Sequence, residues 1–380
     1  MTDGIGIGHV ALGAWSGGLF MHFGEPIGEE RLETLLRPGD DIHTVITADA
    51  YGAGAADSLV GRALRGRPRD SYALVGAVGH DFYRGERAGS KGYPRFTDPS
   101  LRKDDEYRDY LFRATESSLE RLGTDRLDLL MLHNPDRVGY SSEVVWRAMT
   151  DLRSQGLTGA IGVAPGPANG FTLDVIGCLE RFGSEIDWAM LILSPFEPWP
   201  VRLVLPACVA NDVRVIARVV DHGGVFHGDV PDEGELGPRD HRSFRPAGWV
   251  QHGRDRLARL APFAERHGLS TLQLAVQWTL AQPAVACTVP TLIQEPGAGA
   301  RDIEQKRADL ADTPRGIVLS ADELAEIEAI GENAGCMVLK GAQPAHDGDE
   351  LPDSWPLTDE LRAVAQRWDI RPERDLVKTH

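Results

Sequence analysis

The sequence predicts a (β/α)8 barrel with long loops at one mouth and a C-terminal tail. Short apolar runs alternate with helical segments along most of the 380 residues. Runs that are apolar throughout are typical of strands buried on both faces of a parallel sheet. Eight such strands with helices between them favour a closed barrel, and a doubly wound open sheet is the alternative.

The eight strands follow one another at intervals that leave room for a helix or a loop. They are expected near residues 8–14, 42–48, 72–78, 127–133, 158–164, 187–194, 213–219 and 285–290. Long loops follow the third strand, at 79–103, and the seventh, at 221–249. Because loops after barrel strands lie at the C-terminal mouth, we expect both to cover that end.

The helices carry their own start and stop signals. A helix over 104–122 ends at Gly123, and another over 142–155 ends before a glycine. Capping boxes at Ser270 and Ser320 open two late helices. The predicted organisation is one barrel domain over 1–335 and a C-terminal extension over 336–380, packed on the barrel and holding a short helix near 358–368.

Composition excludes several classes of function. The net charge of −17 argues against a nucleic-acid groove or an anionic membrane surface as partner. No apolar run approaches the roughly 20 residues that span a bilayer, and no secretory signal is visible. The four scattered cysteines are expected to be reduced core thiols. These observations predict a cytoplasmic protein with a small-molecule substrate, and they leave the oligomeric state open.

Two strand ends carry candidate catalytic side chains. Tyr51 follows the second strand in the segment Thr-Ala-Asp-Ala-Tyr-Gly, and His133 ends the apolar fourth strand before Asn-Pro-Asp. At a barrel mouth, a phenol and an imidazole can both hydrogen-bond a substrate oxygen. An ordinary turn with a half-buried tyrosine, and a histidine that caps its strand, are the alternative interpretations.

Taken in order, five segments resemble the aldo-keto reductase superfamily over about residues 8–332. The first two are those of Tyr51 and His133, and the third runs from Gly156 to Val163. The others run from Val215 to Gly224 and from Gln273 to Pro290. The resemblance implies a (β/α)8 barrel, an NAD(P)H cofactor, and carbonyl reduction by a tetrad of Tyr, His, Lys and Asp.

The sequence departs from the family pattern at half of that tetrad. The family's aspartate, five residues before the tyrosine, is Ile46, and its lysine at the end of the third strand is Ala77. Loss of one partner alone would leave a buried charge, at a cost of about 3–5 kcal/mol, whereas apolar replacement of both is nearly neutral. We therefore interpret the two changes as a matched substitution that leaves Tyr51 and His133.

The cofactor pocket of the family has changed as well. The carboxamide-binding positions are Ala164, Pro165 and Met190, and the stacking aromatic of the seventh strand is replaced by Arg218. Arg301 and Lys306 follow the late phosphate loop. Binding of NADP(H) is possible but in doubt, and the candidate contacts are Trp15, Arg218, Arg301 and Lys306. A solvated helix face is the alternative interpretation of the last two.

Other polar groups lie near the vacated lysine position. His80 and Asp81 directly follow the third strand and are a candidate base and orienting acid. Plain loop residues are the alternative. A metal site is not expected, because the loop histidines His222, His227 and His241 lack recognisable ligand spacing.

Three hypotheses of function follow. The first is an aldo-keto-reductase-like oxidoreductase that acts on a small polar carbonyl or sugar-like metabolite with a depleted tetrad. The second is a non-redox, cofactor-independent lyase, dehydratase or epimerase that uses His133 and Tyr51, with His80 and Asp81 as further candidate groups. The third is a non-catalytic binding protein. Fold analogy favours the first and residue chemistry favours the second. The first stays ahead, because hydride transfer depends mainly on placing a cofactor beside a carbonyl.

Overall fold

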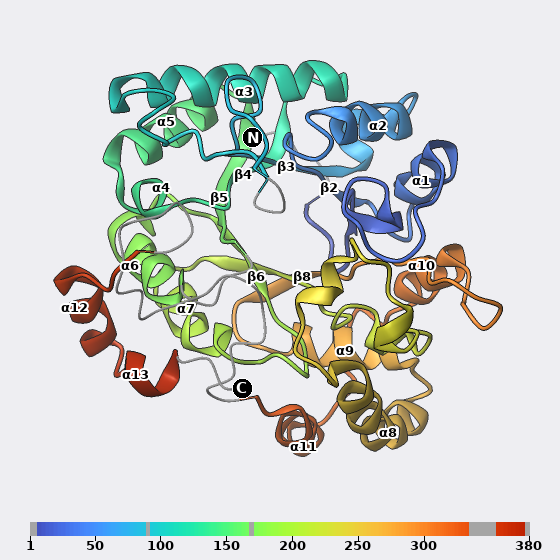
Figure 1. Cartoon of the computed structure of the whole chain (residues 1–380). Helices are drawn as coiled ribbons and strands as arrows, with labels where there is room; N and C mark the ends of the chain where they lie inside the picture. Colours follow the sequence, from blue (N-terminus) through green and yellow to red (C-terminus); the bar gives the residue numbers. More distant parts are fainter. Residues whose placement is uncertain (1–5, 89–91, 167–170, 334–354, 377–380) are drawn as a thin grey trace.

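The chain folds as an eight-stranded parallel barrel (Figure 1). The computed structural model describes residues 6–88, 92–166, 171–333 and 355–376. The strands are β1 (Leu12–Gly13), β2 (Thr44–Ile46), β3 (Ala73–Val78), β4 (Leu127–His133), β5 (Thr158–Ala164), β6 (Trp188–Ile192), β7 (Arg214–Arg218) and β8 (Val285–Val289). They are paired in sequence order. A parallel bridge between Val10 and Thr288 joins the β1 segment to β8, which closes the barrel and confirms the predicted fold.

Helices surround the sheet, and the helices that the sequence predicted are among them. They are α1 (Glu29–Leu36), α2 (Ala55–Leu64), α3 (Tyr107–Leu122), α4 (Arg137–Ser141), α5 (Glu143–Ser154), α6 (Thr172–Phe182), α7 (Leu205–Ala210), α8 (Trp249–His267), α9 (Thr271–Leu280), α10 (Ile303–Ala311), α11 (Ala321–Gly331), α12 (Asp359–Arg367) and α13 (Pro372–Asp375). Gly123 ends α3 with a φ of 68°, as a left-handed cap requires. Both predicted capping boxes are formed, at Ser270 and Ser320.

The first strand is shorter than predicted. Only Leu12 and Gly13 pair in register with β2. The backbone before them bonds to the other neighbour, because the Ala11 amide donates to the Thr288 carbonyl and the Thr288 amide donates to the His9 carbonyl, each at 2.9 Å. These residues therefore close the barrel as bridges instead of extending the β1 ladder.

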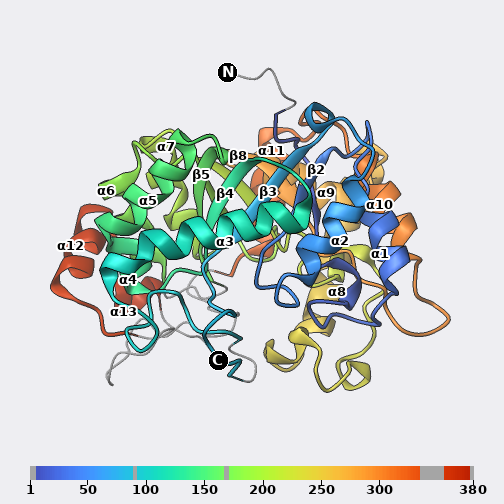
Figure 2. The ribbon, with the colours of Figure 1, turned by 90° about the horizontal axis from the view of Figure 1, so that it is seen from above.

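Two apolar layers hold the barrel together. The larger lies between the sheet and the helices, where, for example, α3 packs outside β3 (Figure 2). The smaller fills the barrel interior and includes Ile46, Ala77 and Met190, with Trp15 and Tyr51 at its edge. Burial of apolar surface on both faces explains why the strands are apolar throughout. The interior layer forms the floor beneath the candidate site.

The described part of the C-terminal extension lies against the barrel. Helix α12 packs on α6, opposite α1 and α10 in Figures 1 and 2. Trp355 stacks on Phe171 with ring centroids 4.7 Å apart, and its indole N–H donates to Asp174 over 3.1 Å. Residues 336–354 of the predicted extension lie outside the described residues, so the proposed boundary after residue 335 stays a prediction.

Within the described part of the chain, no helix is both long and apolar enough to span a bilayer. Cys178, Cys208 and Cys287 are buried free thiols, as expected, and Cys336 lies outside the described residues.

Candidate active site

The ends of β1, β2 and β4 bring three aromatic side chains together. The rings of Tyr51 and His133 meet edge-on with centroids 5.6 Å apart, and Trp15 meets Tyr51 edge-on at 6.3 Å. Tyr51 is half-buried, whereas Trp15 and His133 are buried. Tyr51 and His133 thus meet at one mouth, as their strand ends predict, and Trp15, a candidate cofactor contact, joins them.

The floor beneath Tyr51 is apolar. Ile46 and Ala77, the positions of the family's acid and lysine, are 1% and 3% exposed and belong to the interior cluster against which Tyr51 packs. Neither side chain can carry a charge, so neither stabilises a phenolate. A tyrosine in such surroundings keeps its proton.

Tyr51 and His133 are both neutral at neutral pH. Burial raises the pKa of Tyr51, an effect that the charge of Arg218 opposes. Burial, together with the nearby charges of Arg95 and Arg218, lowers the pKa of His133 to about 3. The His133 Nδ1 is buried and has no hydrogen-bond partner among the described residues, which leaves Nε2 as the nitrogen that can meet a substrate. The pair offers a phenol O–H that can donate to a carbonyl oxygen and a neutral imidazole that can accept a proton at its free nitrogen.

His80 lies behind His133, with ring centroids 5.0 Å apart. Its Nδ1 is 2.8 Å from the carbonyl oxygen of Tyr93, to which it can donate, and its Nε2 is 3.1 Å from the side-chain amide of Asn134, from which it can accept. Burial, and next the charge of Arg95, hold the pKa of His80 well below its usual value. Both ring nitrogens of this neutral histidine are thus engaged by protein groups.

Asp81 follows His80 in sequence, but among the described residues its carboxylate forms no hydrogen bond with the His80 ring. Its buried carboxylate pairs with Arg102 and accepts the backbone N–H groups of Tyr83 and Arg84 at 2.9 and 3.0 Å. These bonds hold the turn at the start of the loop after β3. A base oriented by Asp81 is therefore not assembled in this structure, and the partner of His80 is the Tyr93 carbonyl.

Arg218, the last residue of β7, extends toward the β5 side of the mouth. Its guanidinium donates to the Pro165 carbonyl over 2.9 Å. Among the described residues it has no carboxylate partner, and its charge acts on both Tyr51 and His133. Around it, Ala164 and Met190 are buried in the interior cluster. This edge of the mouth thus presents one guanidinium on an otherwise apolar wall.

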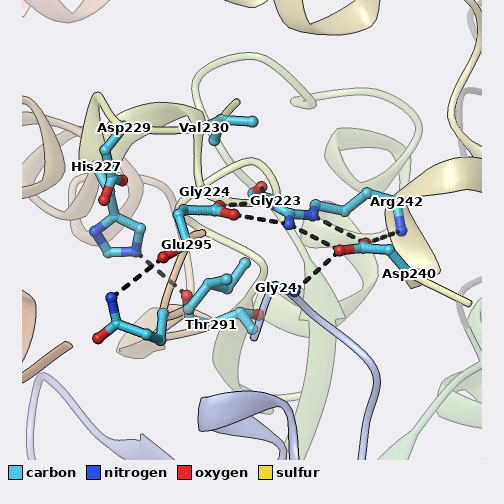
Figure 3. Close-up of polar contacts among 12 residues, drawn as sticks. Gly24, Gly223, Gly224, His227, Asp229, Val230, Asp240, Arg242, Thr291 and Glu295 are labelled. Carbon is cyan, nitrogen blue, oxygen red and sulfur yellow. Dashed lines mark hydrogen bonds and ion pairs between the residues drawn. The ribbon is translucent and has the colours of Figure 1, made fainter. Parts of the chain in front are cut away.

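The loop after β7 is fastened to the loop after β8 by the protein's own carboxylates. Asp221 accepts the backbone N–H groups of Gly224 and Thr291, each over 2.7 Å, and burial raises its pKa to about 6. Arg242 forms buried ion pairs with Asp240 and with Glu295 of the loop after β8 (Figure 3). Cations and amides that could hold an external anion are thus bonded internally.

The two predicted phosphate cations are engaged in the same way. The ammonium group of Lys306 is fully buried, 2.7 Å from the Asp229 carboxylate and 2.7 Å from the Ile293 carbonyl. Arg301 lies 3.5 Å from Asp309, and its backbone N–H also donates to Asp229. Lys306 is therefore an internal ion-pair partner and not the exposed residue of a solvated helix face.

A dinucleotide cofactor requires free cations or amides for its phosphates and polar partners for its carboxamide. Carboxylates of the protein occupy the Gly224 and Thr291 amides and the Lys306 ammonium. The Arg301 side chain is 37% exposed and pairs with Asp309 over 3.5 Å. At the carboxamide positions, Ala164, Pro165 and Met190 carry no side-chain hydrogen-bonding group that could replace an amide. In this arrangement the residues present do not fit a dinucleotide.

The three loop histidines contact different parts of the protein. His222 pairs with Glu197, His227 contacts the Thr291 carbonyl, and His241 contacts the His22 carbonyl. No group of three or more potential ligands is arranged to hold a metal ion within the described ranges.

Two buried acids near the mouth were not singled out from the sequence. Asp49, two residues before Tyr51, is fully buried, and neither carboxylate oxygen has a partner among the described residues. Burial, and next the charge of Asp57, hold its pKa well above its usual value. Glu197 follows β6 and binds both His222 and Arg245. Asp49 is the aspartate of the Thr-Ala-Asp-Ala-Tyr-Gly segment that contains Tyr51, whereas no sequence pattern marked Glu197.

Known proteins share this architecture and sequence pattern. A model of the aldo/keto reductase family matches residues 29–332. D-threo-aldose 1-dehydrogenase of a Pseudomonas species is 26% identical over 254 residues, which cover 64% of this chain and 73% of that protein. A 6-dehydroglucose reductase of Agrobacterium fabrum is 22% identical over 295 residues, which cover 75% and 84%.

Solved structures show the same fold. Glycerol dehydrogenase of Gluconobacter oxydans has a TM-score of 0.65 at 22% identity and covers 86% of this chain and 93% of its own. An aldo/keto reductase of Klebsiella pneumoniae in complex with NADP and acetate has a TM-score of 0.55 at 24% identity and covers 85% and 90%. The family model spans most of the chain, including both strand ends that carry Tyr51 and His133. This protein therefore belongs to the aldo/keto reductase family.

Proposed function

We propose that this protein is an enzyme that polarises the carbonyl group of a small, polar, sugar-like metabolite and catalyses a non-redox proton transfer on it. The observation that carries the proposal is the contact between Tyr51 and His133, both kept neutral, above an apolar floor. The Tyr51 phenol can stabilise negative charge that develops on a carbonyl oxygen, and the neutral His133 imidazole can accept a proton. Relatives named for an aldose and a dehydroglucose support a sugar-like substrate.

The reaction that fits these groups is an isomerisation or epimerisation through an enol. Tyr51 donates a hydrogen bond to the carbonyl oxygen, which raises the acidity of the neighbouring C–H bond. That proton moves to Nε2 of His133, and the C–H electron pair becomes the C=C bond of the enolate. Return of a proton to the opposite face of the same carbon gives the epimer. Return to the neighbouring carbon gives the isomer when the hydroxyl proton of that carbon moves to the former carbonyl oxygen. No oxidant or reductant is consumed.

The second candidate is the family's NAD(P)H-dependent oxidoreduction with a depleted tetrad. It is supported by the protonated Tyr51, which can supply a proton, and by the relatives named as dehydrogenases and reductases. If this candidate holds, the double variant Ile46→Asp/Ala77→Lys should reduce a simple aldehyde faster than wild type, because the lysine would stabilise the Tyr51 phenolate. If the reaction is non-redox, the double variant should gain no such activity.

Two measurements on the whole chain separate the candidates. In calorimetric titrations with NADPH and NADH, we expect no binding up to millimolar cofactor. In D₂O, a panel of aldoses, ketoses and their acids should include a compound that gains deuterium next to its carbonyl. Tyr51→Phe and His133→Gln should each slow this exchange by about 10²- to 10⁴-fold. Micromolar cofactor binding would favour the second candidate, and binding of a sugar without exchange or redox turnover would favour a non-catalytic binding protein.

A further inference from the structure

We infer that Arg218 is the binding site for a carboxylate group carried by the substrate. The substrate would then be an anionic carbonyl compound, of the class of sugar acids and 2-oxo acids. This inference rests on the proposed carbonyl site of Tyr51 and His133 and names the chemistry that lies beside it. Nothing in the family membership of the chain requires a cation at this position.

The first observation is that the Arg218 guanidinium lacks an ionic partner. A guanidinium has five N–H donors, and among the described residues Arg218 uses one of them, on the Pro165 carbonyl. No carboxylate lies within ion-pairing distance among the described residues. By contrast, Arg245 pairs with Glu197 and Arg242 with Glu295. In a chain with 57 acidic and 40 basic residues, an unpaired guanidinium in a site is available to an external anion.

The second observation is that Arg218 is held firmly. It pairs in register with Ile192 of β6 and with Val289 of β8. The next residue, Val219, has a φ of 60°, which is rare for a β-branched side chain. Strain of this kind persists where the surrounding structure enforces it, and it concentrates at functional sites. The backbone therefore fixes the direction in which the Arg218 side chain leaves the strand, and the bond to the Pro165 carbonyl holds its guanidinium.

The third observation is the coupling of Arg218 to the two proposed catalytic groups. Its positive charge helps to lower the pKa of His133, which weakens this imidazole as a base in the free protein. A carboxylate bound on the guanidinium would offset that charge. Bound substrate would thus strengthen His133 as the proton acceptor when the substrate is in place. A neutral sugar would leave the base weak.

The charge of the site favours a single carboxylate over a phosphate. The buried cations of the segments after β7 and β8 are already paired: Arg242 with Glu295, Arg245 with Glu197, and Lys306 with Asp229. One free guanidinium matches one negative charge and the planar, two-pronged shape of a carboxylate. A phosphate ester, with up to two charges, would call for a second free cation.

Matched ligand pairs test this inference by calorimetry on the full chain. The probes are D-glucuronate against D-glucose, D-galacturonate against D-galactose, 2-oxobutyrate against butanone, and inorganic phosphate. Wild type should bind at least one carboxylate about 10- to 100-fold more tightly than its neutral partner, as expected for hydrogen bonds to a charged group. The inference would be overturned by equal binding within every pair or by the absence of carboxylate binding at about 50 mM. Tighter binding of phosphate than of every carboxylate would also overturn it.

Variants assign the preference to the guanidinium. Arg218→Met should abolish the preference for the carboxylate while affinity for the neutral partner is kept, and Arg218→Lys should retain part of it. Arg108→Met is the matched control, because Arg108 forms an exposed ion pair with Asp151 on the outer helices. A preference that survives in both Arg218 variants would contradict the assignment.

The proposed function and this inference can fail separately. Tyr51→Phe should keep the carboxylate preference and lose deuterium exchange. Exchange that proceeds equally well on neutral sugars would leave the carbonyl chemistry in place and remove the role of Arg218. A carboxylate preference in wild type without exchange on any probe would leave the anion site in place and remove the proposed reaction.

Discussion

The buried ion pair of Lys306 and Asp229 allows a sharp test of whether the phosphate loop has become a structural element. The two charged groups are 2.7 Å apart, with side chains 0% and 4% exposed. Lys306→Met would leave the Asp229 carboxylate buried without its cation. Loss of one partner of a buried pair costs about 3–5 kcal/mol in free energy of unfolding.

The size of the effect on melting follows from the length of the chain. At about 2.1 cal/mol/K per residue, unfolding of 380 residues carries an entropy of about 0.8 kcal/mol/K. Lys306→Met should therefore lower the Tm by about 4–6 °C. The double variant Lys306→Met/Asp229→Asn should recover most of this loss, because the asparagine oxygen can still accept the Arg301 backbone N–H.

An exposed ion pair between Glu304, on the same helix as Lys306, and Arg31 of α1 provides the control. Arg31 and Glu304 lie 2.6 Å apart with side chains 41% and 48% exposed, so Glu304→Gln should cost less than about 1 kcal/mol. The assay is urea unfolding and thermal melting at pH 7.5, alongside titration with NADPH. A Lys306→Met variant as stable as the Glu304→Gln control would refute the argument, as would one that keeps its stability and loses affinity for NADPH.

Other predictions concern buried acids. Burial opposes ionisation of Glu197, yet the charges of Arg245 and His222 lower its pKa to about 2. Glu197→Gln should therefore destabilise the fold by about 3–5 kcal/mol in urea unfolding. A change below about 1 kcal/mol would show that the ion pair is not buried. Burial raises the pKa of Asp174 to about 7, although the Trp355 indole N–H lowers it. The folded protein therefore holds a proton there that the unfolded chain releases above about pH 4. Stability should fall as pH rises from about 4 to 7, and Asp174→Asn should reduce this loss in unfolding curves recorded across that range.

Local patterns in the sequence accounted for most of the architecture. Apolar runs predicted all eight strands, and the capping boxes at Ser270 and Ser320 and the glycine after α3 predicted helix ends that the structure confirms. These signals depend on residues a few positions apart, because capping, periodicity and turn conformation are local. The ends of β2 and β4 could therefore be placed at one mouth, and with them Tyr51 and His133.

The partners of the charged side chains could be decided only by the tertiary structure. His80 and Asp81 are neighbours in sequence, yet successive residues leave the backbone in different directions, and Asp81 meets Arg102 while His80 meets the Tyr93 carbonyl. Lys306 follows the phosphate-loop pattern in sequence, but its ion pair with Asp229 joins the segments after β7 and β8, which only barrel closure brings into contact. The sequence by itself determined which groups are present and at which end of the barrel they lie. Packing of distant segments determined which charged groups are paired, and it left Arg218 without an ionic partner among the described residues. Charge pairing depends on distances between segments, which no local sequence pattern encodes.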